Sequence, residues 1–191
     1  MLSFIKKVSV GLILSFGIFT SISSQTKITG ITMVAPPSPF KSDPMPAIKR
    51  MSSKWVALVP YAFIASNNAI VRFGSDRQWW GERKEGIVES IKRAKDNNMR
   101  IMIKPQIWMH GKWIGDMDYE SESDWKEWEE SYEEYIMTFV DIAIKYDVEM
   151  ICIGTEIEIA SKRREAYWRK LIKKIRDKYE GLLTYSSNWD S

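Results

Sequence analysis

One carboxylate comes directly after the most apolar strand that the sequence predicts. Residues 150–154 read Met-Ile-Cys-Ile-Gly, and Thr155 and Glu156 follow them. An unbroken apolar run of this length is typical of a strand that is buried on both faces of a parallel sheet. In a β/α barrel, the carboxyl ends of such strands form the floor of the active site. Glu156 is therefore the first candidate for a catalytic residue.

The elements that must position this carboxylate alternate between strands and helices. The pattern of apolar residues predicts five strands, over residues 27–35, 55–63, 100–107, 150–156 and 182–189. It predicts helices over residues 82–97, 124–146 and 165–178, with a helical turn over 46–52. We expect Asp124 to cap the middle helix in a capping box with Glu127, and Gly181 to end the last helix.

The aromatic residues of the middle helix are predicted to belong to the core. Trp125, Trp128 and Tyr132 begin a series of large apolar residues that recur every three or four positions. This spacing is typical of a helix face that packs on a sheet, and it argues against a role in binding. Cys152, the only cysteine, is interpreted as a small buried hydrophobe, and a single cysteine allows no intrachain disulfide.

Alternating strands and helices predict a parallel sheet with crossover helices. An open doubly wound sheet and a closed barrel both fit the alternation. A doubly wound sheet typically carries a glycine-rich phosphate loop after its first strand, but here Pro36 and Pro37 follow that strand and no GxGxxG motif occurs. The sequence therefore favours an α/β fold of the (β/α)8 barrel type. Such a barrel typically needs about 250 residues, so we expect one that is truncated after about five strands.

The N-terminal residues have the pattern of a signal peptide. Lys6 and Lys7 precede an apolar run over residues 8–19, and small residues follow at 21–24. We predict a signal peptide over 1–24 and the N-terminal part of a catalytic domain over 25–191. The protein is then exported to the periplasm or the medium, with no stable membrane anchor after cleavage.

Composition argues against several classes of function. The chain has a formal net charge of +3, and two of its 28 basic residues, Lys6 and Lys7, lie in the predicted signal peptide. The remainder is nearly neutral, which gives no electrostatic footprint for nucleic acid. His110 is the only histidine and the single cysteine is far from it, so we expect no metal site and no cofactor. Nine tryptophans suit the flat apolar faces of sugar rings. No oligomeric state is predicted.

Five motifs occur in order along the chain. They are Trp79-Trp80-Gly81-Glu82-Arg83 with Glu85-Gly86-Ile87; Met102-Ile103-Lys104-Pro105-Gln106-Ile107-Trp108; Trp113-Ile114-Gly115-Asp116; Ile151-Cys152-Ile153-Gly154-Thr155-Glu156; and Leu183-Thr184-Tyr185-Ser186-Ser187-Asn188-Trp189-Asp190. In this order they resemble the first part of glycoside hydrolase family 113. The members of that family are retaining β-mannanases with catalytic (β/α)8 barrels.

The resemblance implies a role for Glu156 as the general acid/base of retaining hydrolysis of a β-linked polysaccharide, with β-mannan as the expected substrate. The family's nucleophile is a second glutamate near the end of strand seven, and no residue of this chain matches it. Retaining hydrolysis needs two carboxyl groups about 5 Å apart. The chain alone is therefore expected to lack the nucleophile. No cofactor is implied, because the two carboxylates do the chemistry.

Further residues are candidates for contact with the sugar. We predict substrate binding by Trp80, Lys104, Trp108, Trp113, Asn188, Trp189 and Asp190. Each tryptophan fits a role in packing equally well, and Lys104 fits an ion pair inside the barrel. Glu158, Asp116 and Asp118 are interpreted as structural or subsite residues before any catalytic role. The alternative function is a truncated, non-catalytic carbohydrate-binding remnant, and a fragment that does not fold alone is a further possibility.

Overall fold

The structure is a computed structural model that describes residues 27–189. The predicted signal peptide and Asp190 lie outside the described residues. A five-stranded sheet forms the centre, and its strands are β1 (Gly30–Met33), β2 (Trp55–Leu58), β4 (Arg100–Ile103), β6 (Met150–Thr155) and β7 (Leu182–Ser186). A second sheet pairs β3 (Tyr61–Ile64) with β5 (Gln106–Met109). All of these strand pairs are parallel.

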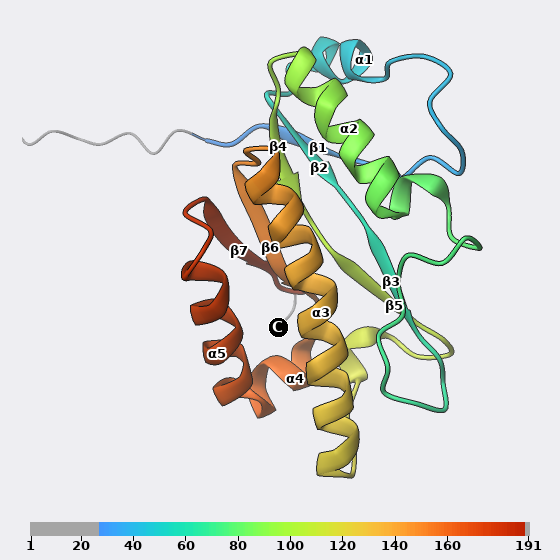
Figure 1. Ribbon diagram of the computed structural model, residues 1–191, viewed down its shortest axis with the longest axis vertical. Helices are drawn as coiled ribbons and strands as arrows, with labels where there is room; N and C mark the ends of the chain where they lie inside the picture. Colours follow the sequence, from blue (N-terminus) through green and yellow to red (C-terminus); the bar gives the residue numbers. More distant parts are fainter. Residues whose placement is uncertain (1–26, 190–191) are drawn as a thin grey trace, which may run out of the picture.

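The order of the strands in space decides between the two expected architectures. The central sheet runs β1-β2-β4-β6-β7, so each strand is added next to the one before it in the chain. A doubly wound sheet reverses direction at a switch point, whereas a barrel adds its strands in sequence. The observed order is the barrel order, and Figure 1 shows the strands side by side in this arrangement.

Two of the predicted strands are each divided in two. Val59 and Pro60 separate β2 from β3, and Lys104 and Pro105 separate β4 from β5. The physical reason is that proline has no N–H to donate to a ladder. The pairing keeps the same register across the break, from Leu58 opposite Ile103 to Tyr61 opposite Gln106. The predictions over 55–63 and 100–107 were therefore right about the extended chain and wrong about its continuity.

Helices follow the strands. They are α1 (Met45–Arg50), α2 (Lys84–Asp96), α3 (Glu122–Lys145), α4 (Glu158–Arg163) and α5 (Glu165–Arg176), with short 3-10 turns η1 (Trp80–Glu82) and η2 (Ile114–Asp116). In Figure 1, α2 and α3 lie across the near face of the sheet and α5 lies beside β6 and β7. No helix among the described residues has the length and apolar character to cross a membrane.

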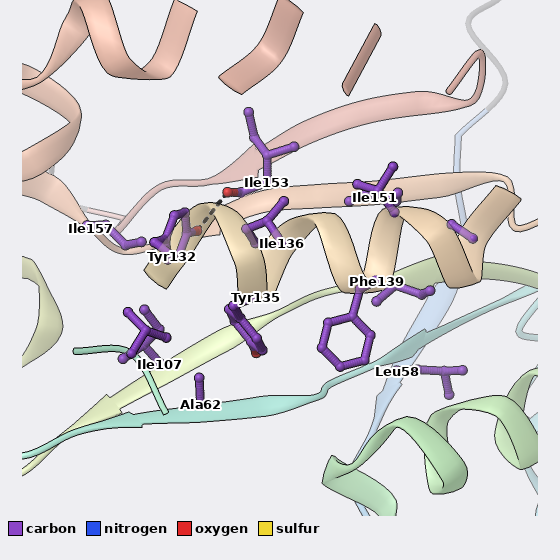
Figure 2. Packing of buried hydrophobic residues seen from close by; sticks show 14 of the residues in the cluster. Leu58, Ala62, Ile107, Tyr132, Tyr135, Ile136, Phe139, Ile151, Ile153 and Ile157 are labelled. Atoms are coloured by element: carbon purple, nitrogen blue, oxygen red, sulfur yellow. Dashed lines mark hydrogen bonds between the residues drawn. The ribbon is translucent and has the colours of Figure 1, made fainter. Parts of the chain in front are cut away.

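The core lies between α3 and the sheet, as the aromatic spacing of this helix predicts. Trp125, Trp128 and Tyr132 are at most 1% exposed. Figure 2 shows Tyr132, Ile136 and other α3 side chains directed toward the strands, and the Tyr132 hydroxyl donates to the Ile153 carbonyl at 2.7 Å. Cys152 is buried, as expected. Burial raises the pKa of Tyr132 well above its ordinary value, because the phenolate has no favourable environment there.

Helix ends differ from the predictions in two places. Ser121, not Asp124, caps α3, and its hydroxyl accepts the Asp124 N–H at 3.1 Å. The helix therefore begins about one turn earlier than expected, with Ser121 at the cap position and Asp124 three residues on. Asp177, not Gly181, is the C-terminal cap of α5. The prediction that α2 ends near Asn97 and Asn98 is confirmed.

The remaining boundaries shift by a few residues. The first strand is shorter than 27–35, the last strand ends at Ser186 instead of residue 189, and α2 begins at Lys84. The segment after Glu156 forms α4, a short helix that is not among the predicted ones. These differences leave the order of elements unchanged.

Candidate active site

Glu156 lies directly after β6 and has an unusual backbone conformation. Its φ is +57°, in the left-handed region. The other described non-glycine residues with positive φ, Ser52, Asn98 and Asp147, each lie just beyond a helix end, where this conformation is common. Glu156 is the exception, since it ends a strand. Its N–H donates to the Ser186 carbonyl at 2.8 Å, which keeps the turned residue attached to β7.

A left-handed glutamate costs about 1–2 kcal/mol in backbone strain, so its surroundings must hold it in place. Thr155 helps, because its hydroxyl donates to the Pro105 carbonyl at 3.3 Å. Gly154 helps by its small size. A Cβ at Gly154 would lie 2.7 Å from the Tyr185 ring and 3.1 Å from the Trp168 ring. Each residue of the Gly-Thr-Glu sequence thus has a structural reason. Gly154 leaves room for two aromatic rings, Thr155 makes a hydrogen bond to Pro105, and Glu156 forms the left-handed turn.

Trp113 contacts the carboxylate from a separate loop. Its indole N–H donates to Oε2 of Glu156 at 3.1 Å. The Trp113 ring in turn rests on Gly115, where a Cβ would be only 2.3 Å from the ring. The loop after β5 therefore presents one tryptophan N–H to the end of β6. The structure brings together these two sequence-predicted residues.

Trp108 and Lys104 come from the neighbouring strand pair. Trp108 lies on β5 with half of its surface exposed, and its ring is 6.2 Å from Phe63 and 5.6 Å from His110. Lys104 is half-buried at the break between β4 and β5, and its backbone N–H donates to Leu58 at 2.8 Å. It makes no ion pair among the described residues, so the alternative role in an ion pair is not seen there. Contact of either residue with substrate stays a prediction.

Trp80 is placed differently from its neighbour Trp79. The Trp80 ring packs edge-on against Phe40 at 5.6 Å, and the backbone N–H of Trp80 donates to the Pro37 carbonyl at 3.1 Å. Trp79 is half exposed and lines a hollow of about 520 Å³. The sequence contained both residues but gave no signal to separate them. Contact of Trp80 with sugar stays a prediction, and Trp79 is a candidate that the sequence analysis did not select.

The residues after β7 are the remaining predicted contacts. Trp189 is 92% exposed, and its backbone N–H donates to Oδ1 of Asn188 at 3.0 Å. Asn188 is half-buried. Asp190 lies outside the described residues. Both described residues follow a strand next to β6, so they lie at the same end of the sheet as Glu156.

Two of the other carboxylates that follow β5 and β6 have structural partners. Glu158 begins α4 and pairs with Lys162 one turn on. Asp118 pairs with Arg163. Asp116 is exposed in η2. These contacts agree with the structural interpretation of Glu158 and Asp118, and no described carboxylate is assigned as the nucleophile.

Glu82 is the titratable group that sequence reasoning missed. It lines the same hollow as Trp79, with Phe63, Arg72, Arg77 and Gln78. Burial raises the pKa of Glu82, while hydrogen bonds from the Gln78 side chain and the Trp79 backbone act in the opposite direction. The pKa of Tyr61 is also raised, by burial and by the nearby Glu82 charge. A partly desolvated carboxyl group in a hollow is a recognised mark of a functional site.

Among residues 27–189, no three metal-ligating side chains of the His, Cys, Asp or Glu type come together. Glu156 offers a proton donor or acceptor, and the exposed tryptophans offer flat apolar surfaces.

Solved structures of three β-mannanases of family 113 are similar to the chain. One β-1,4-mannanase in a complex is 31% identical, with a TM-score of 0.63, 73% of this chain covered and 46% of that chain. A second β-1,4-mannanase is 30% identical, with a TM-score of 0.68 and coverage of 84% and 55%. The β-mannanase of Alicyclobacillus acidocaldarius in complex with ManMIm is 24% identical, with a TM-score of 0.76 and coverage of 85% and 55%.

The chain thus spans about half the length of these structures. The likeness confirms the expected α/β fold of the (β/α)8 barrel type. A search of curated proteins found no match. The model of Glycoside Hydrolase Family 113 matches residues 38–190, which is most of the chain. With its strands in barrel order and this match, the chain belongs to glycoside hydrolase family 113.

Proposed function

We propose that the chain takes part in retaining hydrolysis of a β-linked polysaccharide, with β-mannan as substrate and Glu156 as general acid/base. The observation that supports this most directly is the left-handed turn at Glu156, together with its hydrogen bonds to the Ser186 carbonyl and from the Trp113 indole. The turn ends the strand and the two hydrogen bonds fix the residue. A carboxylate held in this way at the carboxyl end of a barrel strand is positioned for chemistry.

The proposed role follows the two steps of retaining hydrolysis. In the first step, the protonated Glu156 gives its proton to the oxygen of the leaving sugar while a nucleophilic carboxylate attacks the anomeric carbon. In the second step, the ionised Glu156 takes a proton from water, which releases the sugar. Because Trp113 holds Oε2, we assign proton transfer to Oε1.

The nucleophile is a second carboxylate that faces the same sugar. Within residues 27–189, Glu158 and Asp118 are ion-paired, so neither is proposed for this step. By the family resemblance, the nucleophile follows a later strand of the barrel. The described part of the chain is therefore proposed to supply the acid/base side of the active site.

The test uses substrates that differ in their need for a proton. Mannohexaose has a poor leaving group, whereas 2,4-dinitrophenyl β-mannoside departs without protonation. In a protein that also contains the nucleophile, Glu156→Gln should lower the turnover of mannohexaose by about 10²–10⁴, spare the first step with the dinitrophenyl substrate, and allow azide to form a glycosyl azide. Glu158→Gln is the matched control. Normal cleavage of mannohexaose by the Glu156→Gln variant contradicts the proposal.

A second candidate is carbohydrate binding without turnover. It is supported by four exposed tryptophans: Trp79, Trp108, Trp113 and Trp189. Calorimetry on residues 25–191 with mannohexaose should then show binding while no shorter sugars are released. Hydrolysis by this purified chain excludes the second candidate.

We further propose that the protein is exported, on the basis of the apolar run over residues 8–19 and the two lysines before it. Intact mass of the secreted protein should show loss of about the first 24 residues. A secreted or cell-bound product that begins at Met1 contradicts this proposal.

A further inference from the structure

We propose that the hollow between Phe63 and the Trp79–Glu82 segment is a sugar-binding subsite that takes one pyranose ring of a β-linked oligosaccharide. This inference rests on the proposed function as far as the class of ligand is concerned. It assigns binding to a group of residues that is separate from the pair of Glu156 and Trp113, and it places Glu82 and Gln78 among the polar contacts.

The hollow is one of two that adjoin. The first has a volume of about 520 Å³ and includes Trp79 and Glu82 in its lining. The second has a volume of about 360 Å³ and includes Trp108 and His110. Phe63 and Arg72 line both of them. Two adjoining hollows with a shared wall have the form expected of neighbouring sites for consecutive rings of one chain.

The side chains match the two kinds of surface that a sugar presents. A pyranose ring has apolar C–H faces and a rim of hydroxyl groups. Trp79 and Phe63 supply flat apolar surfaces, and Trp79 is half exposed. Glu82 and Gln78 supply an acceptor and an amide at the same hollow, and Arg72 adds a fork of donors. A few convergent polar groups in an aromatic hollow are typical of small-molecule sites.

The polar groups are held in position before any ligand binds. The Gln78 amide donates to the Tyr61 carbonyl at 2.9 Å and accepts the Ser75 N–H at 3.0 Å. Phe63 and Arg72 exchange two backbone hydrogen bonds of 2.8 and 2.9 Å, which tie the loop back onto β3. Rigid partners lose little entropy on binding, so a preorganised hollow favours affinity.

The Glu82 carboxylate has two hydrogen-bond partners, the Gln78 side chain and the Trp79 backbone, and no charged one among the described residues. Glu82 is half-buried and the pKa of its side chain is raised by burial, so keeping it charged at neutral pH has a cost. No ion pair with Glu82 occurs among the described residues; Arg83 beside it pairs with Asp76 instead. A neutral glutamine would fill the same space without that cost. A charged acceptor for sugar hydroxyls explains why a carboxylate is present.

The second hollow leads toward the proposed catalytic residue. Trp108 lies on β5, and the loop that follows β5 carries Trp113 to Glu156. The aromatic series Phe63, Trp108 and His110 has ring separations of 6.2 and 5.6 Å. A chain of sugars in the two hollows is therefore directed along β5 toward Trp113.

The experiment measures binding of mannohexaose to the full chain by calorimetry, with variants at each side of the hollow. Trp79→Ala and Glu82→Gln should each weaken binding about tenfold, while Tyr146→Ala, which removes an aromatic ring near the end of α3, should leave it unchanged. Thermal melts of every variant check that the fold is retained. An unchanged affinity in both hollow variants contradicts the proposal, as does a wild-type chain that binds no mannohexaose.

A second measurement covers the case in which a variant does not fold. Backbone amide signals of the wild-type chain are followed by NMR while mannohexaose is added. Signals of residues 75–82 should shift, and those of α5 should not; shifts confined to other segments overturn the proposal. Glu156→Gln separates the two proposals. It should bind mannohexaose like the wild type, and if it also turns over normally, the acid/base assignment fails while the subsite stands.

Discussion

The indole N–H of Trp113 donates to Oε2 of Glu156 across 3.1 Å, although the two residues are 43 positions apart. The loop after β5 and the end of β6 therefore act as one structural unit. Gly115 belongs to this unit as well, because the Trp113 ring occupies the space that a Cβ would need. Precise placement of an acid relative to the bond it protonates is a large part of its effect.

Trp113→Phe keeps an aromatic ring on the loop, but it removes the N–H that reaches Glu156 and the outer indole atoms that lie against Gly115. We expect kcat/KM for mannohexaose to fall about tenfold, because the proton donor loses a positioning contact. Turnover of 2,4-dinitrophenyl β-mannoside in its first step should be nearly unchanged, because that leaving group needs no proton. The measurement is the ratio of the two rates.

Trp108→Phe serves as the control, since Trp108 makes no hydrogen bond to Glu156 among the described contacts. It should affect KM for both substrates alike. If Trp113→Phe lowers both rates by the same factor, its role is in general stability or binding and not in the positioning of Glu156.

Gly154→Ala should destabilise the fold by about 1–3 kcal/mol, because the new Cβ overlaps the Tyr185 ring at 2.7 Å. The cost should be smaller in a Tyr185→Ala background, where the ring is gone. Urea unfolding of the four proteins in this double-mutant cycle gives the coupling free energy. Equal costs in the two backgrounds would show that the ring is not what excludes a side chain.

Ser121→Ala should cost about 1 kcal/mol of unfolding free energy, because the N–H of Asp124 loses its acceptor at the start of α3. Ser123→Ala is the matched control. The described contact of its hydroxyl is the one with the Ser121 hydroxyl, so its removal should cost less than about 0.5 kcal/mol. A larger effect of Ser123→Ala than of Ser121→Ala would contradict the assignment of Ser121 as the cap.

Tyr119 provides a test at high pH. Burial, with Asp124 and Glu127 nearby, raises the pKa of Tyr119 to about 12 from an ordinary value of 10.0. The unfolded chain therefore loses this proton first, and its contribution to stability is complete below pH 10 and is lost as the pH rises to about 12. Tyr119→Phe cannot ionise, so its stability relative to the wild type should increase over that interval.

The comparison is made by urea unfolding at pH 8 and pH 11. At pH 8 the Tyr119→Phe variant should be within about 0.5 kcal/mol of the wild type. The reason is that the Tyr119 hydroxyl is buried without a hydrogen-bond partner among the described residues, and the ring keeps its contact with Trp125 at 5.2 Å. A difference between variant and wild type that is the same at both pH values contradicts the assignment.

The parts of the fold that depend on local pattern could be predicted from the sequence. The apolar run before Glu156 placed this residue at the end of a buried strand, and the spacing of Trp125, Trp128 and Tyr132 identified the core face of α3. These predictions succeed because backbone geometry fixes which residues of an element share a face, and burial requires those residues to be apolar. The roles assigned to the site residues stay predictions.

Other features depend on contacts between distant residues. Trp79 and Trp80 are adjacent and identical in type, yet the Trp80 ring packs against the distant Phe40 while Trp79 stays half exposed. Similarly, Ser121 and Asp124 both fit the rules for a helix cap. The earlier cap prevails because one more turn adds backbone hydrogen bonds to a helix that has already formed.

Pro60 and Pro105 lie opposite each other, so the break between β2 and β3 is level with the break between β4 and β5. Their carbonyls are held by side chains from elsewhere, Pro60 by the Tyr135 hydroxyl at 2.8 Å and Pro105 by Thr155 at 3.3 Å. The small sheet of β3 and β5, which carries Phe63 and Trp108, is thus held by hydrogen bonds from an outer helix and from the residue beside Glu156. The placement of these two exposed rings therefore depends on how α3 packs against the strands as well as on the strands themselves.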